Sequence, residues 1–64
     1  METKVFYQVN KVFTLINSES KIAKFDKEED AINYAELSKM AEPRYGYKVI
    51  KVTEETIFST EEEN

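Results

Sequence analysis

The side chains best suited to chemistry in this 64-residue chain are its carboxylates, which form three clusters, at residues 26–30, 54–55 and 61–63. Two carboxylates can act as general acid and base when their surroundings separate their pKa values. The first cluster, however, opens a predicted helix, where negative charge stabilises the positive end of the helix dipole. The other two lie at a predicted bend and in a polar tail. We therefore interpret all three clusters as structural or solubilising.

Nucleophilic and metal-dependent catalysis lack their usual side chains. The chain contains no His and no Cys, so its serines have no imidazole to activate them, and no thiolate or imidazole can bind a metal. The acids at 26–30 lack the alternating spacing and the Gly of a calcium loop. Gly46 is the one glycine, too few for a phosphate-binding loop. The sequence predicts a protein without enzymatic activity, cofactor or metal.

Two alternative functions involve nucleic acid: binding of a single strand, and mimicry of a nucleic acid. Tyr7 and Phe13, with Lys11 between them, could stack on unpaired bases from a sheet surface. Four more residues would extend this surface: Tyr45, Tyr47, Lys48 and Lys51. A net charge of −4 repels phosphate backbones and argues against such binding. The other alternative is an acidic nucleic-acid mimic, because residues 25–64 hold eleven acids against five bases and carboxylates can imitate phosphates.

Residues 26–41 have the one strong helix pattern in the chain. Asp26 can cap the first turn through its carboxylate, and Glu29 three residues later completes a capping box. Pro43 cannot continue the helix, which ends it at this point. Ile32 lies at the margin of the predicted sheet-facing side. That side consists of small and apolar residues: Ala31, Tyr34, Ala35, Leu37, Ser38 and Ala41.

The first part of the chain predicts two strands. Residues 4–16 are rich in β-branched and aromatic side chains and contain neither Gly nor Pro, which predicts one long strand. Two shorter strands broken near Asn10 are the alternative. Asn and Ser predict a turn at 17–20, and residues 21–25 return as a short strand. The side of the long strand that should meet the helix is the more apolar one: Val5, Tyr7, Val9, Lys11, Phe13 and Leu15.

The third strand begins at residue 47, and two interpretations of its end remain. It continues, bent, to residue 59, or it folds back at 54–55 into a short fourth strand at 56–59. We favour the continuous strand, because Glu-Glu lacks the Gly or Asn that a tight hairpin turn requires.

The predicted fold class is α+β, with the element order β-β-α-β. A right-handed crossover gives a three-stranded antiparallel sheet in the order 2-1-3, with one helix packed on one face. A chain this short forms a single domain, which we place at residues 1–59. Residues 60–64 are an acidic C-terminal tail that we expect to be disordered.

The predicted helix is too short to cover the predicted sheet. A strand of residues 4–16 spans about 43 Å at ~3.3 Å per residue, whereas a helix of residues 26–41 spans about 24 Å. A second copy covering the remaining apolar surface would make a homodimer; a monomer with scattered surface apolar residues is the alternative. Tyr and Arg near the helix–strand connection are types favoured at protein interfaces, which suits a larger protein partner. The candidate interface residues are Phe6, Val12, Ile16, Ile50, Val52, Phe58, Arg44, Tyr45 and Tyr47.

The motif Phe25-Asp26-x-x-Glu29 opens the Ala-rich helix of this Lys/Glu-rich chain. In this general pattern the chain resembles short accessory proteins of bacteriophages and prophages. The resemblance implies a protein that binds a host factor, including defence enzymes, and modulates or inhibits it. We expect a cytoplasmic location and no membrane contact, because the chain has no Cys, no apolar run near 18 residues and no basic-then-apolar leader.

Overall fold

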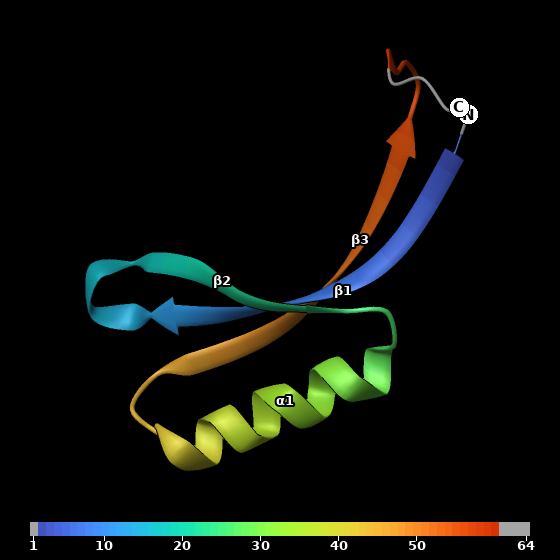
Figure 1. Cartoon of the computed structure of the whole chain (residues 1–64). Coiled ribbons are helices and arrows are strands. Elements are labelled where there is room, and N and C mark those ends of the chain that lie inside the picture. Colours follow the sequence, from blue (N-terminus) through green and yellow to red (C-terminus); the bar gives the residue numbers. More distant parts are fainter. Residues whose placement is uncertain (1, 61–64) are drawn as a thin grey trace.

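The computed structural model describes residues 2–60 and has the predicted α+β architecture. The elements follow in the order β1 (Glu2–Phe13), a 3-10 turn (Thr14–Ile16), β2 (Ser18–Phe25), α1 (Glu28–Ala41) and β3 (Gly46–Thr56). The three strands form one antiparallel sheet in the order β2-β1-β3, with α1 on one face (Figure 1). β3 is a single continuous strand, so the described residues contain no fourth strand, but it ends at Thr56 and not at the predicted residue 59. Residues 61–64 of the predicted tail lie outside the described residues.

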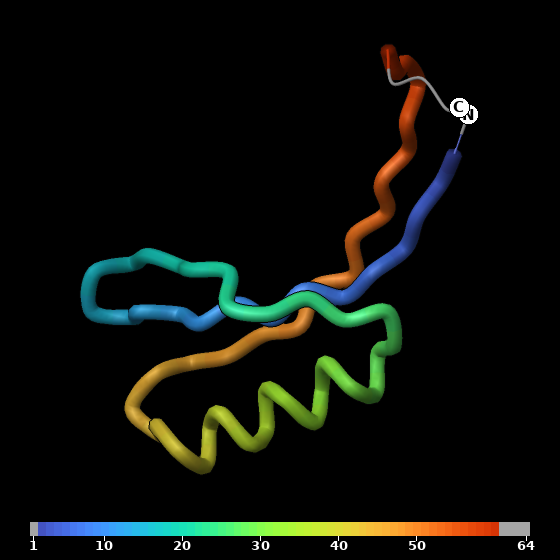
Figure 2. Tube along the Cα trace, viewed as in Figure 1, coloured from blue at the N-terminus to red at the C-terminus, as the bar shows by residue number. Residues whose placement is uncertain are grey.

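The central strand β1 pairs with its two neighbours over different lengths. It pairs with β3 from Glu2 to Val12, but with β2 only from Tyr7 to Phe13. Residues 2–6 of β1 and residues 52–56 of β3 therefore form a two-stranded arm. The arm extends away from the helix and from β2 (Figure 2).

The turn between β1 and β2 differs from the prediction. Leu15 and Ile16 were expected inside a strand that ends at residue 16, but β1 ends at Phe13 and a 3-10 turn follows. Asn17 closes this turn in the left-handed conformation, with φ 52° and ψ 50°, and its N–H donates to the carbonyl oxygen of Thr14 at 3.3 Å. Asn tolerates these angles better than most residues. Leu15 and Ile16 therefore leave the sheet and are exposed to solvent.

β1 is unbroken at Asn10, as in the favoured interpretation, and the irregularity lies in the neighbouring strand. β1 continues through this position, but β2 contains a β-bulge: Val9 pairs with Ala23, whereas Asn10 pairs with Lys21. Ile22 is the extra residue that the bulge accommodates. The bulge changes which side chains of β2 lie on each face of the sheet.

The helix begins later than the predicted capping box requires. Lys27, in an extended conformation, is the N-cap residue and forms no side-chain capping hydrogen bond, so the expected cap by Asp26 is wrong. The ring of Phe25 packs against that of Tyr34 with 5.4 Å between centroids. This contact ties the end of β2 to the helix. Asp26 and Lys27, which connect β2 to α1, are not part of the helix. Glu29 still lies in the first turn, where its charge is favourable.

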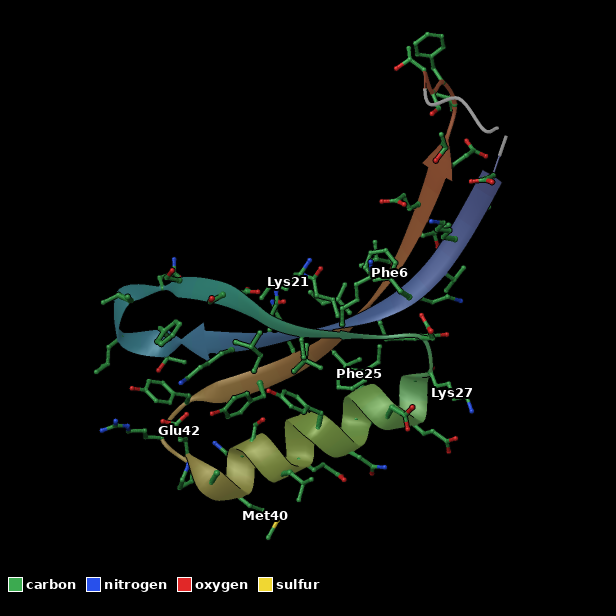
Figure 3. The ribbon with its side chains drawn as sticks, in the orientation of Figure 1. Phe6, Lys21, Phe25, Lys27, Met40 and Glu42 are labelled. Carbon is green, nitrogen blue, oxygen red and sulfur yellow. The ribbon has the colours of Figure 1, made fainter. Side chains whose placement is uncertain are left out.

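The helix presents small residues to the sheet, and the protein core is correspondingly small. Among residues 2–60 the fully buried apolar side chains are Val9 in the sheet and Ala31 in the helix. Leu37 was expected to face the sheet but is 65% exposed, because the sheet-facing side is rotated towards Ile32. Figure 3 shows Phe25 between sheet and helix, with Met40 pointing away.

The molecule is elongated, measuring 47 × 26 × 18 Å. Its radius of gyration is 15.0 Å, whereas a compact domain of this length has about 11 Å. It exposes 5385 Å², whereas the scaling for compact monomers gives about 4,200 Å². The single chain therefore leaves uncovered much of the surface that a compact fold would bury.

Candidate protein-binding site

An apolar hollow lies at the end of the molecule opposite the arm. It forms where the turn after β1 meets the connection between α1 and β3, and its volume is about 300 Å³. We call it the tip groove. Its lining residues are Phe13, Thr14, Leu15, Ile16, Arg44 and Tyr45. Exposed aliphatic side chains beside aromatic and Arg side chains are a composition typical of protein-binding surfaces.

Two aromatic rings form the base of the tip groove. Phe13 and Tyr45 pack edge to face, with 5.2 Å between ring centroids and an interplanar angle of 70°. The ammonium of Lys11 lies 4.1 Å from the Tyr45 centroid, and the guanidinium carbon of Arg44 lies 5.0 Å from it. Edge-to-face packing and cation–π attraction both favour this arrangement. The Tyr45 ring is therefore held in place by side chains from β1 and from the connection.

Hydrogen bonds anchor the connection between α1 and β3. Lys39 donates to the carbonyl oxygens of Pro43 at 2.6 Å and Tyr45 at 3.0 Å. The Tyr47 hydroxyl donates to the carbonyl oxygen of Glu42 at 3.4 Å. Burial and the Glu42 carboxylate raise the pKa of Tyr47. These bonds position Tyr45 at the groove.

An ion pair joins β1 to the residue after the helix. Lys11 Nζ lies 2.9 Å from Glu42 Oε1. The hydrogen bond from Lys11 lowers the pKa of Glu42, and the same bond raises the pKa of Lys11. Lys11, Lys39 and Arg44 lie near the groove, and Glu42 pairs with Lys11 there. This end of the molecule is therefore locally cationic, although the chain carries a net charge of −4.

The sheet face opposite the helix carries a polar network at its centre. Gln8 Nε2 donates to Asn10 Oδ1 at 2.9 Å, and Asn10 Nδ2 donates to Glu19 Oε1 at 3.0 Å. Lys48 Nζ lies 2.6 Å from Glu19 Oε2. Hydrogen bonds from Lys48 and from Asn10 lower the pKa of Glu19. Asn10 is only 8% exposed, so the network connects all three strands through a buried amide.

The network changes the interpretation of this open face. Phe6, Val12, Ile50 and Val52 do lie on it, as predicted, but each is half-buried. The ammonium of Lys24 covers the Phe6 ring, 4.2 Å from its centroid. Figure 3 shows Phe6 on the side of the sheet away from α1. The open face is a mixed surface and not a continuous apolar one.

The structure divides the remaining predicted interface residues between the two ends of the molecule. Ile16, Arg44 and Tyr45 line the tip groove. Tyr47 is half-buried beside it, and Phe58 lies beyond β3, 80% exposed. The prediction did not place Lys11, Phe13 or Leu15 in the site: Leu15 was assigned to the helix-facing side, although Asn17 and the serines after it indicated a nearby turn.

The aromatic residues proposed for base stacking already contact other residues of the fold. Tyr7 lies opposite Phe25 on the helix-covered face, and Phe13 packs against Tyr45. Within the described range, no three Asp or Glu side chains lie close enough together to hold a metal ion.

The 14-residue α1 is too short and too polar to cross a bilayer, and no other helix of residues 2–60 could do so.

Comparison with known proteins adds no relative: no family model matches this chain, and no curated protein or solved structure is significantly similar to it.

Proposed function

We propose that this protein is a non-enzymatic protein-binding module, homodimeric when no other partner is bound, that modulates or inhibits a larger host protein. In this proposal the tip groove receives an apolar segment of a protein. The main support is the exposure of Leu15 and Ile16 beside the Phe13–Tyr45 pair. Exposed aliphatic side chains next to a fixed aromatic base lose water-accessible apolar area when a segment docks, which favours binding.

The small core supports the same proposal. Within the described part of the chain, more large apolar side chains are exposed than are fully buried. Apolar patches that the fold leaves open commonly mark sites of protein association. The resemblance to phage accessory proteins suggests a host protein as the larger partner.

Affinity capture from bacterial lysate tests the groove directly. The wild-type chain should retain one or more proteins, and the variant Leu15→Ser/Ile16→Ser should lose them. Both replaced side chains are exposed, so the fold should remain intact. The matched control is Leu37→Ser/Met40→Ser, which removes two exposed apolar side chains from the outer side of α1. The control should capture the same proteins as the wild type.

Two outcomes would contradict the proposal. One is capture of nothing above background by the wild-type chain. The other is capture that the groove variant and the control retain equally, which would place binding elsewhere on the molecule.

A further inference from the structure

We propose that the tip groove of one copy receives residues 57–63 of a second copy, and that two copies exchange these segments reciprocally. The inference rests on the proposed function, because it names the partner that the groove would bind. Ile57 and Phe58 supply the apolar part of the segment, and Glu61, Glu62 and Glu63 follow them in the sequence.

The segment and the groove match in polarity. Ile57 and Phe58 are 77% and 80% exposed, so both have apolar surface to bury. The groove offers Leu15, Ile16 and an aromatic base of suitable size. An apolar pair entering this hollow removes apolar area of both partners from water.

The segment and the groove also match in charge. Three acids follow Phe58 within five residues. Lys11, Lys39 and Arg44 lie near the groove, where Glu42 pairs with Lys11. Arg44 is exposed at the groove, where a carboxylate could pair with its guanidinium. Charge complementarity therefore favours this end of the molecule for the acidic segment.

The segment cannot fill the groove of its own chain. β3 separates Gly46, beside Tyr45, from Thr56, and ten residues of strand span about 33 Å. Phe58 follows Thr56 by two residues, which reach only about 7 Å. The groove and the end of β3 lie at opposite ends of the molecule (Figure 1). Any Phe58 in the groove must therefore come from another copy.

The same geometry allows a closed pair. Two copies lying antiparallel place each segment beside the other copy's groove, so both contacts form at once and no free groove remains for a third copy. The molecule exposes 5385 Å², roughly 1,100 Å² more than a compact monomer of its mass. A standard interface buries about 800 Å² per partner, so the excess surface is large enough for a stable dimer.

One groove cannot hold two segments, so exchange between copies competes with capture of another protein. Dilution should dissociate the pair and free the groove. Capture of a host protein per molecule should therefore rise as the concentration falls below the dimer dissociation constant.

Light scattering and sedimentation equilibrium of the full chain test the exchange. The wild-type chain should have the mass of a dimer. The segment variant Ile57→Ser/Phe58→Ser and the groove variant Leu15→Ser/Ile16→Ser should each weaken the dimer about a hundredfold, at about tenfold for each of the two contacts. Leu37→Ser/Met40→Ser is the matched control and should dimerise like the wild type.

Mixing the two variants gives the sharper result. A mixed dimer retains one intact contact, between the segment of the groove variant and the groove of the segment variant. It should therefore form about tenfold more tightly than either variant alone. Arg44→Glu should weaken the wild-type dimer, and it should also reduce the dependence of dimerisation on salt concentration.

A monomeric wild-type chain, or a dimer that resists the segment variant, would overturn the exchange. Lysate capture that still depends on Leu15 and Ile16 would then leave the proposed function intact. A groove variant that changes neither the mass nor the capture would overturn both proposals.

Discussion

The ammonium of Lys11 lies 2.9 Å from the carboxylate of Glu42, although 31 residues separate them in the chain. This pair connects the central strand to the residue that follows α1. It also holds Lys11 over the ring of Tyr45. One contact therefore links the sheet, the end of the helix and the tip groove.

The first prediction concerns acid. The pKa values of Glu42 and Glu19 lie below the ordinary value of 4.5 in the folded chain, mainly because Lys11 and Lys48 donate hydrogen bonds to them. The unfolded chain therefore binds more protons at low pH, so the stability that these acids contribute is lost as the pH falls below 4.5 and through the folded values.

Thermal unfolding at several pH values measures this dependence. The melting temperature should decline more steeply on acidification for the wild type than for Glu42→Gln. Equal slopes would show that the pair does not act in solution. At the alkaline end, the raised pKa values of Lys11 and Tyr47 predict lost stability as the pH rises above their ordinary values of 10.5 and 10.0.

The second prediction concerns the buried amide of Asn10. Asn10→Ala removes the group that connects Gln8 to Glu19 and should lower the free energy of unfolding by about 1–3 kcal/mol. Urea titration gives this value. The exposed Asn33→Ala in α1 is the control and should not destabilise the protein, because Ala raises helix propensity by up to about 0.7 kcal/mol. A neutral Asn10→Ala would mean that the network contributes nothing to the fold.

The third prediction concerns the start of α1. Lys27 is the N-cap residue and supplies no side-chain cap, so Lys27→Asp should stabilise the protein by about 1 kcal/mol, through a new capping hydrogen bond and favourable charge. Asp26→Ala should have little effect, because Asp26 lies outside the capping position. Stability is measured by chemical denaturation. If Asp26→Ala destabilises the protein and Lys27→Asp has no effect, Asp26 is the cap that the sequence predicts.

The fourth prediction concerns the left-handed Asn17. Asn17→Ala should destabilise the chain by about 1 kcal/mol, because an alanine Cβ is strained at φ 52°. Asn17→Gly should be nearly neutral, since Gly adopts this conformation readily. The two variants should be compared by thermal unfolding. If both lose the same stability, the side chain of Asn17 matters rather than its backbone conformation.

The sequence was sufficient to predict the strand order and the continuous third strand. β-branched alternation in β1 and β3 and the acidic first turn of α1 are local patterns, and they determined the element order correctly. The handedness of the crossover then determined the sheet order. These features depend on residues close together in the chain, which is why they could be predicted.

The tip groove could not be predicted, because it depends on whether residues 14–16 continue the strand or form a turn. Apolar patterning does not distinguish these two conformations. Thr14, Leu15 and Ile16 have strong strand propensity, yet Asn17 turns the chain and leaves them outside the sheet. The position of Tyr45 against Phe13 then depends on the anchoring of the α1–β3 connection, which involves residues far apart in the sequence.

The polar network was missed for a related reason. The bulge at Ile22 places Lys21, and Glu19 two residues before it, on the same face of the sheet as Asn10. Without the extra residue, Glu19 would project towards the helix side, since a shift of one residue exchanges the two faces of a strand. The position of the bulge depends on how β1 and β2 pair, and the composition of either strand alone does not reveal it.

The arm has a consequence for how copies of this chain meet when crowded. β2 ends at Phe25, opposite Tyr7, so the peptide groups on that side of residues 2–6 find no strand beside them. Such an edge is a template on which further strands can add without limit. The alternation of Glu2 and Lys4 along it resists that growth. Neutralising these two charges would therefore expose the protein to fibre formation.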